Sequence, residues 1–185
     1  MELFQKRGYV KTTVEEIAAH AGLTERTFFR YFTDKREVLF SGSKELEKGI
    51  IDHIEQAPRE ASPLDVVVSA FEAAGAELQE RRELSYVRAR HALVTKHAEI
   101  QERELIKLAS LALAVTQALH ARGISEPTAS LAAEAGIAIF KIGFERWVRD
   151  RKPHDFAAHV REAATALRAL SAASKAQAGP TRARR

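Results

Sequence analysis

The sequence predicts an all-α fold, and three observations support this prediction. Hydrophobic types make up 45% of the 185 residues, enough for a sizeable core in one or two domains. Glycine and proline number only 9 and 5, whereas Ala, Leu, Glu and Arg, which favour helices, are abundant. Apolar residues recur at three- and four-residue spacing, and no alternating pattern indicates a strand. We expect about nine helices on this spacing.

The first helix is expected to be short. Residues 1–7 precede Gly8, and Leu3 and Phe4 can attach this segment to a core. Isolated helices of this length are marginal in water, so we expect packing against other helices to stabilise it.

Two short helices joined by a tight turn come next. Thr13 and Glu16 form a capping box, in which the hydroxyl accepts from a first-turn amide and the carboxylate accepts from the cap amide. Gly22 ends the first of these helices in a left-handed conformation. Thr24 caps the second, which buries Phe28 and leaves its other side available to a groove. This is the pattern of a helix-turn-helix.

Longer helices with recognisable starts are predicted in the rest of the chain. Asp34 and Glu37 form a second capping box, which begins a helix that connects two domains and ends before Pro58. Ser62 caps the next, with Pro63 in its first turn. The expected helices are residues 34–57, 62–80, 83–96, 99–122, 127–149 and 155–172.

An ordered set of residues extends the helix-turn-helix pattern. The set is Leu3, Phe4, Gly8, Tyr9, Thr13, Ile17, Ala18, Ala21, Gly22, Thr27, Phe28, Phe29, Tyr31, Phe32 and Lys35. In this order and spacing, residues 3–40 resemble the DNA-binding domain of the TetR family of transcriptional regulators. That family usually has tyrosine where this chain has Phe29, so a hydroxyl contact is absent. It also usually begins its first helix earlier, so we expect the first helix here to be truncated.

The resemblance implies two domains and a tail. Residues 1–43 are expected to form the helix-turn-helix DNA-binding domain, and residues 44–172 a helical ligand-binding and dimerisation domain. Residues 173–185 lack apolar periodicity, so we expect a disordered tail. Its four basic residues equal the whole formal net charge of +4. The net charge is therefore poor evidence for DNA binding, and the motif must carry that inference.

Candidate DNA contacts lie on both short helices and just after them. They are Thr13, Thr24, Glu25, Arg26, Thr27, Phe29, Arg30, Tyr31 and Lys35. Arg26 and Arg30 suit bidentate guanine contacts or phosphate pairing, and solvated surface charge is the alternative. The two cap threonines lie at helix N-termini, which suit phosphate; a structural cap alone is the alternative. The resemblance implies that Tyr31 and Lys35 hold the DNA backbone.

A small-molecule site in the C-terminal domain is a further implication of the resemblance. The candidates are Phe71, Tyr86, Arg90, His91, Phe140 and Phe144. Their aromatic rings and few polar groups suit a largely apolar ligand. For each aromatic side chain, core packing is the alternative. Binding of that ligand is expected to lower operator affinity through coupling between the two sites.

Apolar stripes on the last two helices predict a dimer surface. The candidates are Ala132, Gly136, Ile139, Phe140, Gly143, Trp147, Val160, Ala164 and Leu167. Small residues allow close helix approach, and aromatic residues fill the gaps. Packing within one chain explains the stripes equally well. The resemblance favours a homodimer, whose two recognition helices, roughly 34 Å apart, meet successive major grooves of one duplex.

The sequence thus predicts a homodimeric TetR-like transcriptional regulator, as a repressor that a small molecule releases from operator DNA. The alternative is a dimeric small-molecule-binding protein with a weakened or vestigial DNA-binding domain.

Catalysis is not expected, because the histidines lack zinc-ligand spacing and no glycine-rich phosphate loop occurs. Nor do we expect a metal or cofactor; the absence of cysteine excludes thiolate ligands and disulfides. No apolar run reaches membrane-spanning length and no signal peptide opens the chain. A cytoplasmic protein without a membrane partner is therefore predicted.

Overall fold

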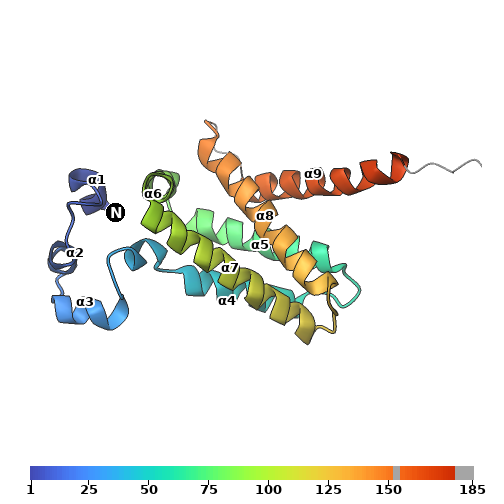
Figure 1. The fold of residues 1–185 in the computed structure, drawn as a ribbon, viewed down its shortest axis with the longest axis horizontal. Helices are drawn as coiled ribbons and strands as arrows, with labels where there is room; N and C mark the ends of the chain where they lie inside the picture. The colour runs from blue at the N-terminus through green and yellow to red at the C-terminus, as the bar shows by residue number, and fades with distance from the viewer. Residues whose placement is uncertain (152–154, 178–185) are drawn as a thin grey trace, which may run out of the picture.

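The computed structural model describes residues 1–151 and 155–177, and within these ranges its regular structure is helical (Figure 1). The elements are α1 (Glu2–Arg7), α2 (Val14–His20), α3 (Glu25–Tyr31), the 3-10 helix η1 (Glu37–Phe40), α4 (Ser43–Gln56), α5 (Pro63–Arg81), α6 (Leu84–Lys96), α7 (Ala98–Ala121), α8 (Thr128–Arg149) and α9 (Phe156–Gln177). The prediction of an all-α fold is confirmed, as is the expected number of α-helices for the described residues.

The three short helices lie together at one end of the molecule (Figure 1). We call residues 1–40 the head and residues 43–177 the body. The head packs against the body through an apolar cluster. From the head this cluster includes Phe4, Tyr9 and Phe40; Val94 of α6 and Ile100 of α7 complete it. Packing of α1 against this cluster supplies the tertiary support that so short a helix needs.

The body is a bundle in which α8 packs against α5, α6, α7 and α9. In the same bundle, α5 also packs against α4 and α9, and α7 against α4 and α6. Close approach depends on small residues: a Cβ on Gly136 of α8 would lie 2.2 Å from Cγ1 of Val67, and one on Gly75 of α5 would lie 2.5 Å from the ring of Phe156. The glycines therefore let aromatic side chains fill the space between helices.

The prediction of one continuous helix from Asp34 to Ala57 is wrong. The chain forms η1, turns at Gly42 with φ 92°, and only then begins α4. Asp34 accepts hydrogen bonds from the main-chain N–H of Arg36 at 2.7 Å and from its guanidinium. Glu37 bonds to α7 instead of returning to the cap amide. The apparent capping box therefore serves contacts that lie outside a single helix.

The last helix is longer than expected. It continues to Gln177, so the start of the predicted tail is helical, and residues 178–185 lie outside the described residues. In Figure 1, α9 crosses α8 and its C-terminal half projects beyond the bundle. No helix in the described part of the chain has the length and apolarity needed to cross a membrane.

Candidate nucleic-acid interface

The first helix of the motif begins as predicted. The hydroxyl of Thr13 accepts from the N–H of Glu16 at 3.2 Å, and the Glu16 carboxylate accepts from the N–H of Thr13 at 3.0 Å. This capping box is confirmed. The turn follows at Gly22 with φ 68°, a conformation that glycine adopts without a steric penalty. Ala18 is buried, so a small residue lies where the two helices cross.

The second helix of the motif, α3, is anchored by one aromatic side chain. Phe28 is only 3% exposed, and its ring lies 5.2 Å from the ring of Phe32 and 5.5 Å, edge-on, from that of Phe29. At the start of α3, the Thr24 hydroxyl accepts from the N–H of Thr27 at 3.2 Å. Because Phe28 fixes one side of α3, the opposite side faces solvent in a defined orientation.

The solvent side of α3 carries the candidate base-reading residues. Glu25, Arg26, Phe29, Arg30 and Tyr31 are exposed, and Phe29 and Tyr31 are 53% and 66% exposed despite their aromatic rings. Arg30 donates from Nη2 to the Tyr31 hydroxyl at 2.9 Å, and its guanidinium lies 4.9 Å from that ring's centroid. Exposed apolar and cationic groups on one short helix are the mixture that a DNA major groove accepts.

Few cations of the head are available to phosphate. Three are paired within the head, as Lys6–Glu2, Arg7–Glu16 and Arg36–Asp34. The hydrogen bond from Arg36 is the main reason that the pKa of Asp34 lies below its usual value. By contrast, Lys11 and Arg26 are exposed and form no hydrogen bond or ion pair within the described part of the chain. Sequence reasoning missed Lys11, although its place two residues before the cap Thr13 could have drawn attention to it.

Lys35 has a different environment from the one that phosphate binding requires. Its ammonium donates to the main-chain carbonyls of Tyr9, Val10 and Thr12 at 2.8, 3.2 and 2.9 Å, and lies 4.5 Å from the Tyr9 ring centroid. An ammonium has three N–H donors, and here each has an acceptor. Lys35 therefore holds the loop between α1 and α2, and in this arrangement it has no donor left for DNA.

The aromatic candidates for a ligand site pack on one another. Phe71 is fully buried, and its ring centroid lies 5.1 Å from that of Phe140. Phe156 lies 5.6 Å from Phe140 and 6.0 Å from Phe144, and Trp147 stacks on it at 5.0 Å. These distances are those of a packed aromatic core, so the rings must separate before a ligand can enter.

The polar candidates for that site have separate roles. Arg90 donates from Nε to the carbonyl of Leu39 at 2.8 Å and pairs with Glu104 at 2.7 Å, so it joins α6 to the head and to α7. His91 lies edge-on to Phe144, and burial lowers the pKa of its imidazole. Of these two, only His91 borders the aromatic cluster. Tyr86 lies under Arg82, whose guanidinium is 4.8 Å from its ring centroid.

Two surface hollows lie elsewhere. One of about 330 Å³ lies between η1 and α7, beside Glu37 and Arg103. The other, of about 480 Å³, lies beside His53 at the end of α4 and Ser69 of α5. Neither is lined by the aromatic candidates.

The residues expected at a dimer surface form core instead. Ala132, Gly136, Ile139, Gly143, Trp147, Val160 and Ala164 are buried within the single chain, and Phe140 and Leu167 are partly buried against the same core. A Cβ added to Gly136 would collide with Val67 of α5. A Cβ added to Gly143 would lie 3.1 Å from the main-chain nitrogen of Val160 in α9. The stripes pack between α5, α8 and α9, so most of these residues are already buried within one chain, and their assignment to a dimer surface stays a prediction.

Known proteins share both the motif and the fold. Residues 1–41 match the sequence profile described as "Bacterial regulatory proteins, tetR family". The "HTH-type transcriptional regulator TcmR" of Streptomyces glaucescens is 37% identical over 73 residues. That match covers 40% of this chain and 32% of the relative, so the chain aligns with about a third of it.

A solved structure extends the likeness to the whole fold. The crystal structure of Thermus thermophilus FadR, described as a TetR family transcriptional repressor in complex with lauroyl-CoA, aligns with a TM-score of 0.56. It is 21% identical, and the alignment covers 92% of this chain and 88% of that one. At this identity the comparison shows a shared fold.

Proposed function

We propose that this chain, whose N-terminal residues 1–41 belong to the tetR family of bacterial regulatory proteins, is a cytoplasmic transcriptional regulator that binds operator DNA. The observation that carries the proposal is the recognition helix: Phe28 anchors α3 from inside, while Arg26, Phe29 and Arg30 face solvent together. In a helix-turn-helix this face enters the major groove. A repressor that occludes its operator is the simplest form of such a regulator.

A homodimer is part of this proposal, through a different surface from the buried stripes. Leu131, Ala138 and Ile142 are exposed and share one face of α8, at spacings of seven and four residues. Leu170 of α9 is 73% exposed. Large apolar side chains aligned on an exposed face favour burial against a second copy. Sedimentation velocity tests this: Ile142→Glu should give monomers, while Leu113→Glu, on an exposed part of α7, should remain dimeric.

The effector that we propose is a largely apolar small molecule bound among the aromatic rings of the body. Phe140, Phe144 and His91 are only partly buried, so they form the accessible edge of the aromatic cluster. Ligand entry requires these rings to separate, which would displace α8 relative to α5 and α6. The small molecule would then bind the displaced arrangement of helices more tightly than the packed one. This difference in affinity is what release from DNA by a ligand requires.

Selection of random duplex DNA with the purified protein tests the regulator directly. A regulator should enrich a palindromic site, because two identical heads read two half-sites. Arg30→Ala should weaken binding to that site by about 1–3 kcal/mol if the guanidinium reads a base. Arg59→Ala, which removes an exposed arginine from the loop after α4, is the matched control and should change binding little.

The rival proposal is a dimeric small-molecule-binding protein whose head no longer selects a sequence. It predicts weak binding to all duplexes, equally affected by Arg30→Ala and Arg59→Ala, and no enriched site. The two proposals therefore differ in one measurement.

A further inference from the structure

The covalent connection between head and body turns at a single glycine, and we call this turn the hinge. The main chain passes from η1 to α4 through Gly42, whose φ of 92° lies in the left-handed region. A Cβ at this position would have no neighbour within 4 Å, so no side chain packs against Gly42 itself. A continuous helix would have transmitted orientation as a rigid rod, but this connection is not one. Side-chain contacts between head and body must therefore fix how the head sits, and the apolar cluster around Phe4, Phe40 and Ile100 is one set of them.

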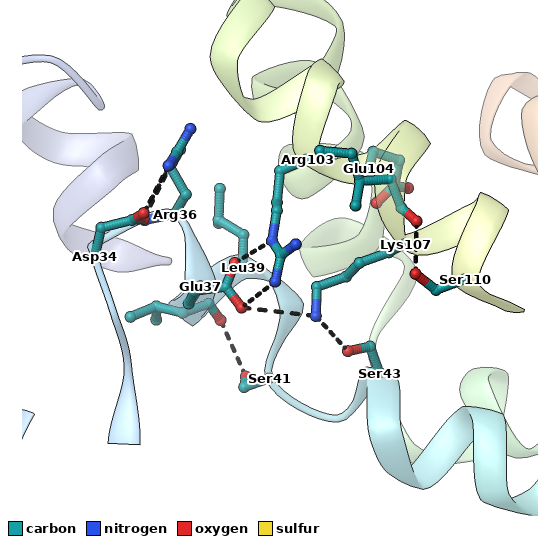
Figure 2. A network of polar contacts seen from close by, with 12 residues as sticks. Asp34, Arg36, Glu37, Leu39, Ser41, Ser43, Arg103, Glu104, Lys107 and Ser110 are labelled. Carbon is teal, nitrogen blue, oxygen red and sulfur yellow. Dashed lines mark hydrogen bonds and ion pairs between the residues drawn. The ribbon is translucent and has the colours of Figure 1, made fainter. Parts of the chain in front are cut away.

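Charged side chains supply such contacts beside the hinge (Figure 2). Glu37 of η1 accepts hydrogen bonds from Nε and Nη2 of Arg103, the second at 3.2 Å, and its Oε2 lies 3.6 Å from Nζ of Lys107. Lys107 also donates to the Ser43 hydroxyl at 3.1 Å, at the start of α4. We call Glu37, Arg103 and Lys107 the clasp. It joins α7 to both sides of the hinge.

The clasp is sheltered enough to hold its geometry. The Glu37 side chain is 15% exposed, so its ion pairs are screened less than pairs at the open surface. The hydrogen bond from Arg103 is the largest influence that holds the pKa of Glu37 below its usual value. The carboxylate is therefore ionised at neutral pH, and both body cations remain attracted to it.

A second set of contacts surrounds the clasp. Arg90 of α6 donates to the carbonyl of Leu39 in η1 and pairs with Glu104 of α7. The Arg90 guanidinium and the Lys107 ammonium lie 5.0 and 5.5 Å from the ring centroid of Phe40. Two helices of the body thus hold η1 by both its main chain and its aromatic side chain.

We propose that the clasp is a positioning device that holds each head in one orientation on its body, and so sets the distance between the two recognition helices of the dimer. The part that concerns DNA rests on the proposed function. Half-sites one helical turn apart are separated by about 34–36 Å, so heads free to turn about Gly42 would accept several spacings. Glu37 therefore determines the spacing of the operator without touching DNA, while α3 determines its sequence.

The clasp can be tested without DNA, because the chain has no cysteine. Cysteines at Ala19 of α2 and Gln117 of α7, both exposed, carry a pair of spin labels that report the distance from head to body. Dilution into unlabelled protein restricts the signal to single chains, even within a dimer. We expect one narrow distance distribution in the parent and a broad one in Glu37→Gln. Glu102→Gln removes an exposed carboxylate of α7 and is the matched control.

Equal widths in the parent and in Glu37→Gln would overturn the proposal. Arg103→Gln removes the cation that binds Glu37 and should broaden the distance distribution to a similar extent. The double variant should broaden it little further, because both substitutions break the same contact. If thermal melting shows that Glu37→Gln is unfolded, Arg103→Gln takes its place, and a distance distribution as narrow as that of the parent would overturn the proposal.

The spacing of the operator provides the second readout. The parent should bind its selected site at least about tenfold more tightly than a site with one base pair inserted between the half-sites. Glu37→Gln should reduce this preference to about threefold or less, with the same half-site sequence. An unchanged spacing preference contradicts the proposal. So does loss of the half-site sequence, because Glu37 would then belong to the DNA-binding surface. If the parent selects no site, the proposed function fails, while the spin labels still decide the clasp.

Discussion

The head and the body are stabilised in different ways. In the body, side chains of α5, α8 and α9 form a continuous apolar core, with Phe71 and Phe156 fully buried. The head buries Phe28 among its own helices, whereas its other buried aromatic side chains, Phe4, Tyr9 and Phe40, belong to the cluster that docks it on the body. The face of α3 that we propose to enter a DNA groove cannot also be buried, so the small head has few side chains left to form a core.

Head and body also differ in what surrounds two cationic side chains that each donate hydrogen bonds to three main-chain carbonyls. Lys35 donates to three carbonyls of the loop after α1, and Arg122 donates to the carbonyls of Ile54, Ala57 and Pro58 at the end of α4, at 2.9, 2.7 and 2.6 Å. Arg122 supplements a large core, whereas Lys35 holds a loop that otherwise has only a few buried side chains, such as Tyr9 and Thr12. We therefore expect the head to open while the body remains folded.

The largest effect is expected in the body. Phe71→Ala should lower the free energy of unfolding by about 3–5 kcal/mol, because it removes a large side chain from a packed site and leaves a cavity. Urea denaturation followed by circular dichroism measures this change. Leu113→Ala, on an exposed part of α7, is the control and should change the free energy by no more than about 0.5 kcal/mol. A small effect of Phe71→Ala would show that its ring borders an open ligand site instead of a core.

The next largest effect should be confined to the head. Phe28→Ala removes its anchor and should destabilise α2 and α3 by about 3 kcal/mol. Hydrogen exchange should show the amides of these helices exchanging faster, while those of α5 and α8 keep their protection. If protection falls equally throughout the chain, head and body unfold as one unit and the comparison fails.

The sequence predicted features of the molecule that depend on neighbouring residues. Thr13 and Glu16 are three residues apart, and Gly22 needs only its own backbone, so the start of α2 and the turn could be placed. Partners distant in sequence could not be identified. Glu37 has the spacing of a capping box with Asp34, yet its carboxylate bonds to Arg103, 66 residues away. Nothing local to either residue signals that pair.

For a related reason, periodicity alone left the packing partner of the apolar stripes on α8 and α9 open. Periodicity shows that Gly136 and Gly143 lie on a face that packs closely, but it does not say against what. Both glycines pack within the chain, one against Val67 and Phe71 and the other against α9. The exposed apolar side chains that sequence reasoning passed over, such as Ile142, could be recognised only after the core had been assigned.

A smaller effect distinguishes two lysines of the head. Lys35→Met should destabilise the head by about 1–3 kcal/mol, because three carbonyls lose their donors. It should leave the slope of log affinity for operator against log salt concentration unchanged. Lys11→Met is the matched variant with the opposite pattern: little loss of stability, and a slope smaller by about 0.9 for each head if Lys11 contacts phosphate. A reduced slope in Lys35→Met would return that residue to the DNA surface.

The smallest effect should appear only in alkali. Burial, as the largest cause, raises the pKa of Tyr9 from 10.0 to about 12, so the folded head holds the phenol proton more tightly than the unfolded chain. The resulting stabilisation is complete below pH 10 and is lost as the pH rises towards 12. Tyr9→Phe should remove this dependence and leave the stability near pH 8 almost unchanged. The comparison with Tyr9→Phe matters because lysines also lose protons in this range. Melting temperatures of the parent and of Tyr9→Phe, measured from pH 8 to 12, should therefore differ only above pH 10 and only for unfolding of the head. A difference in unfolding of the body would mean that the titrating group lies elsewhere.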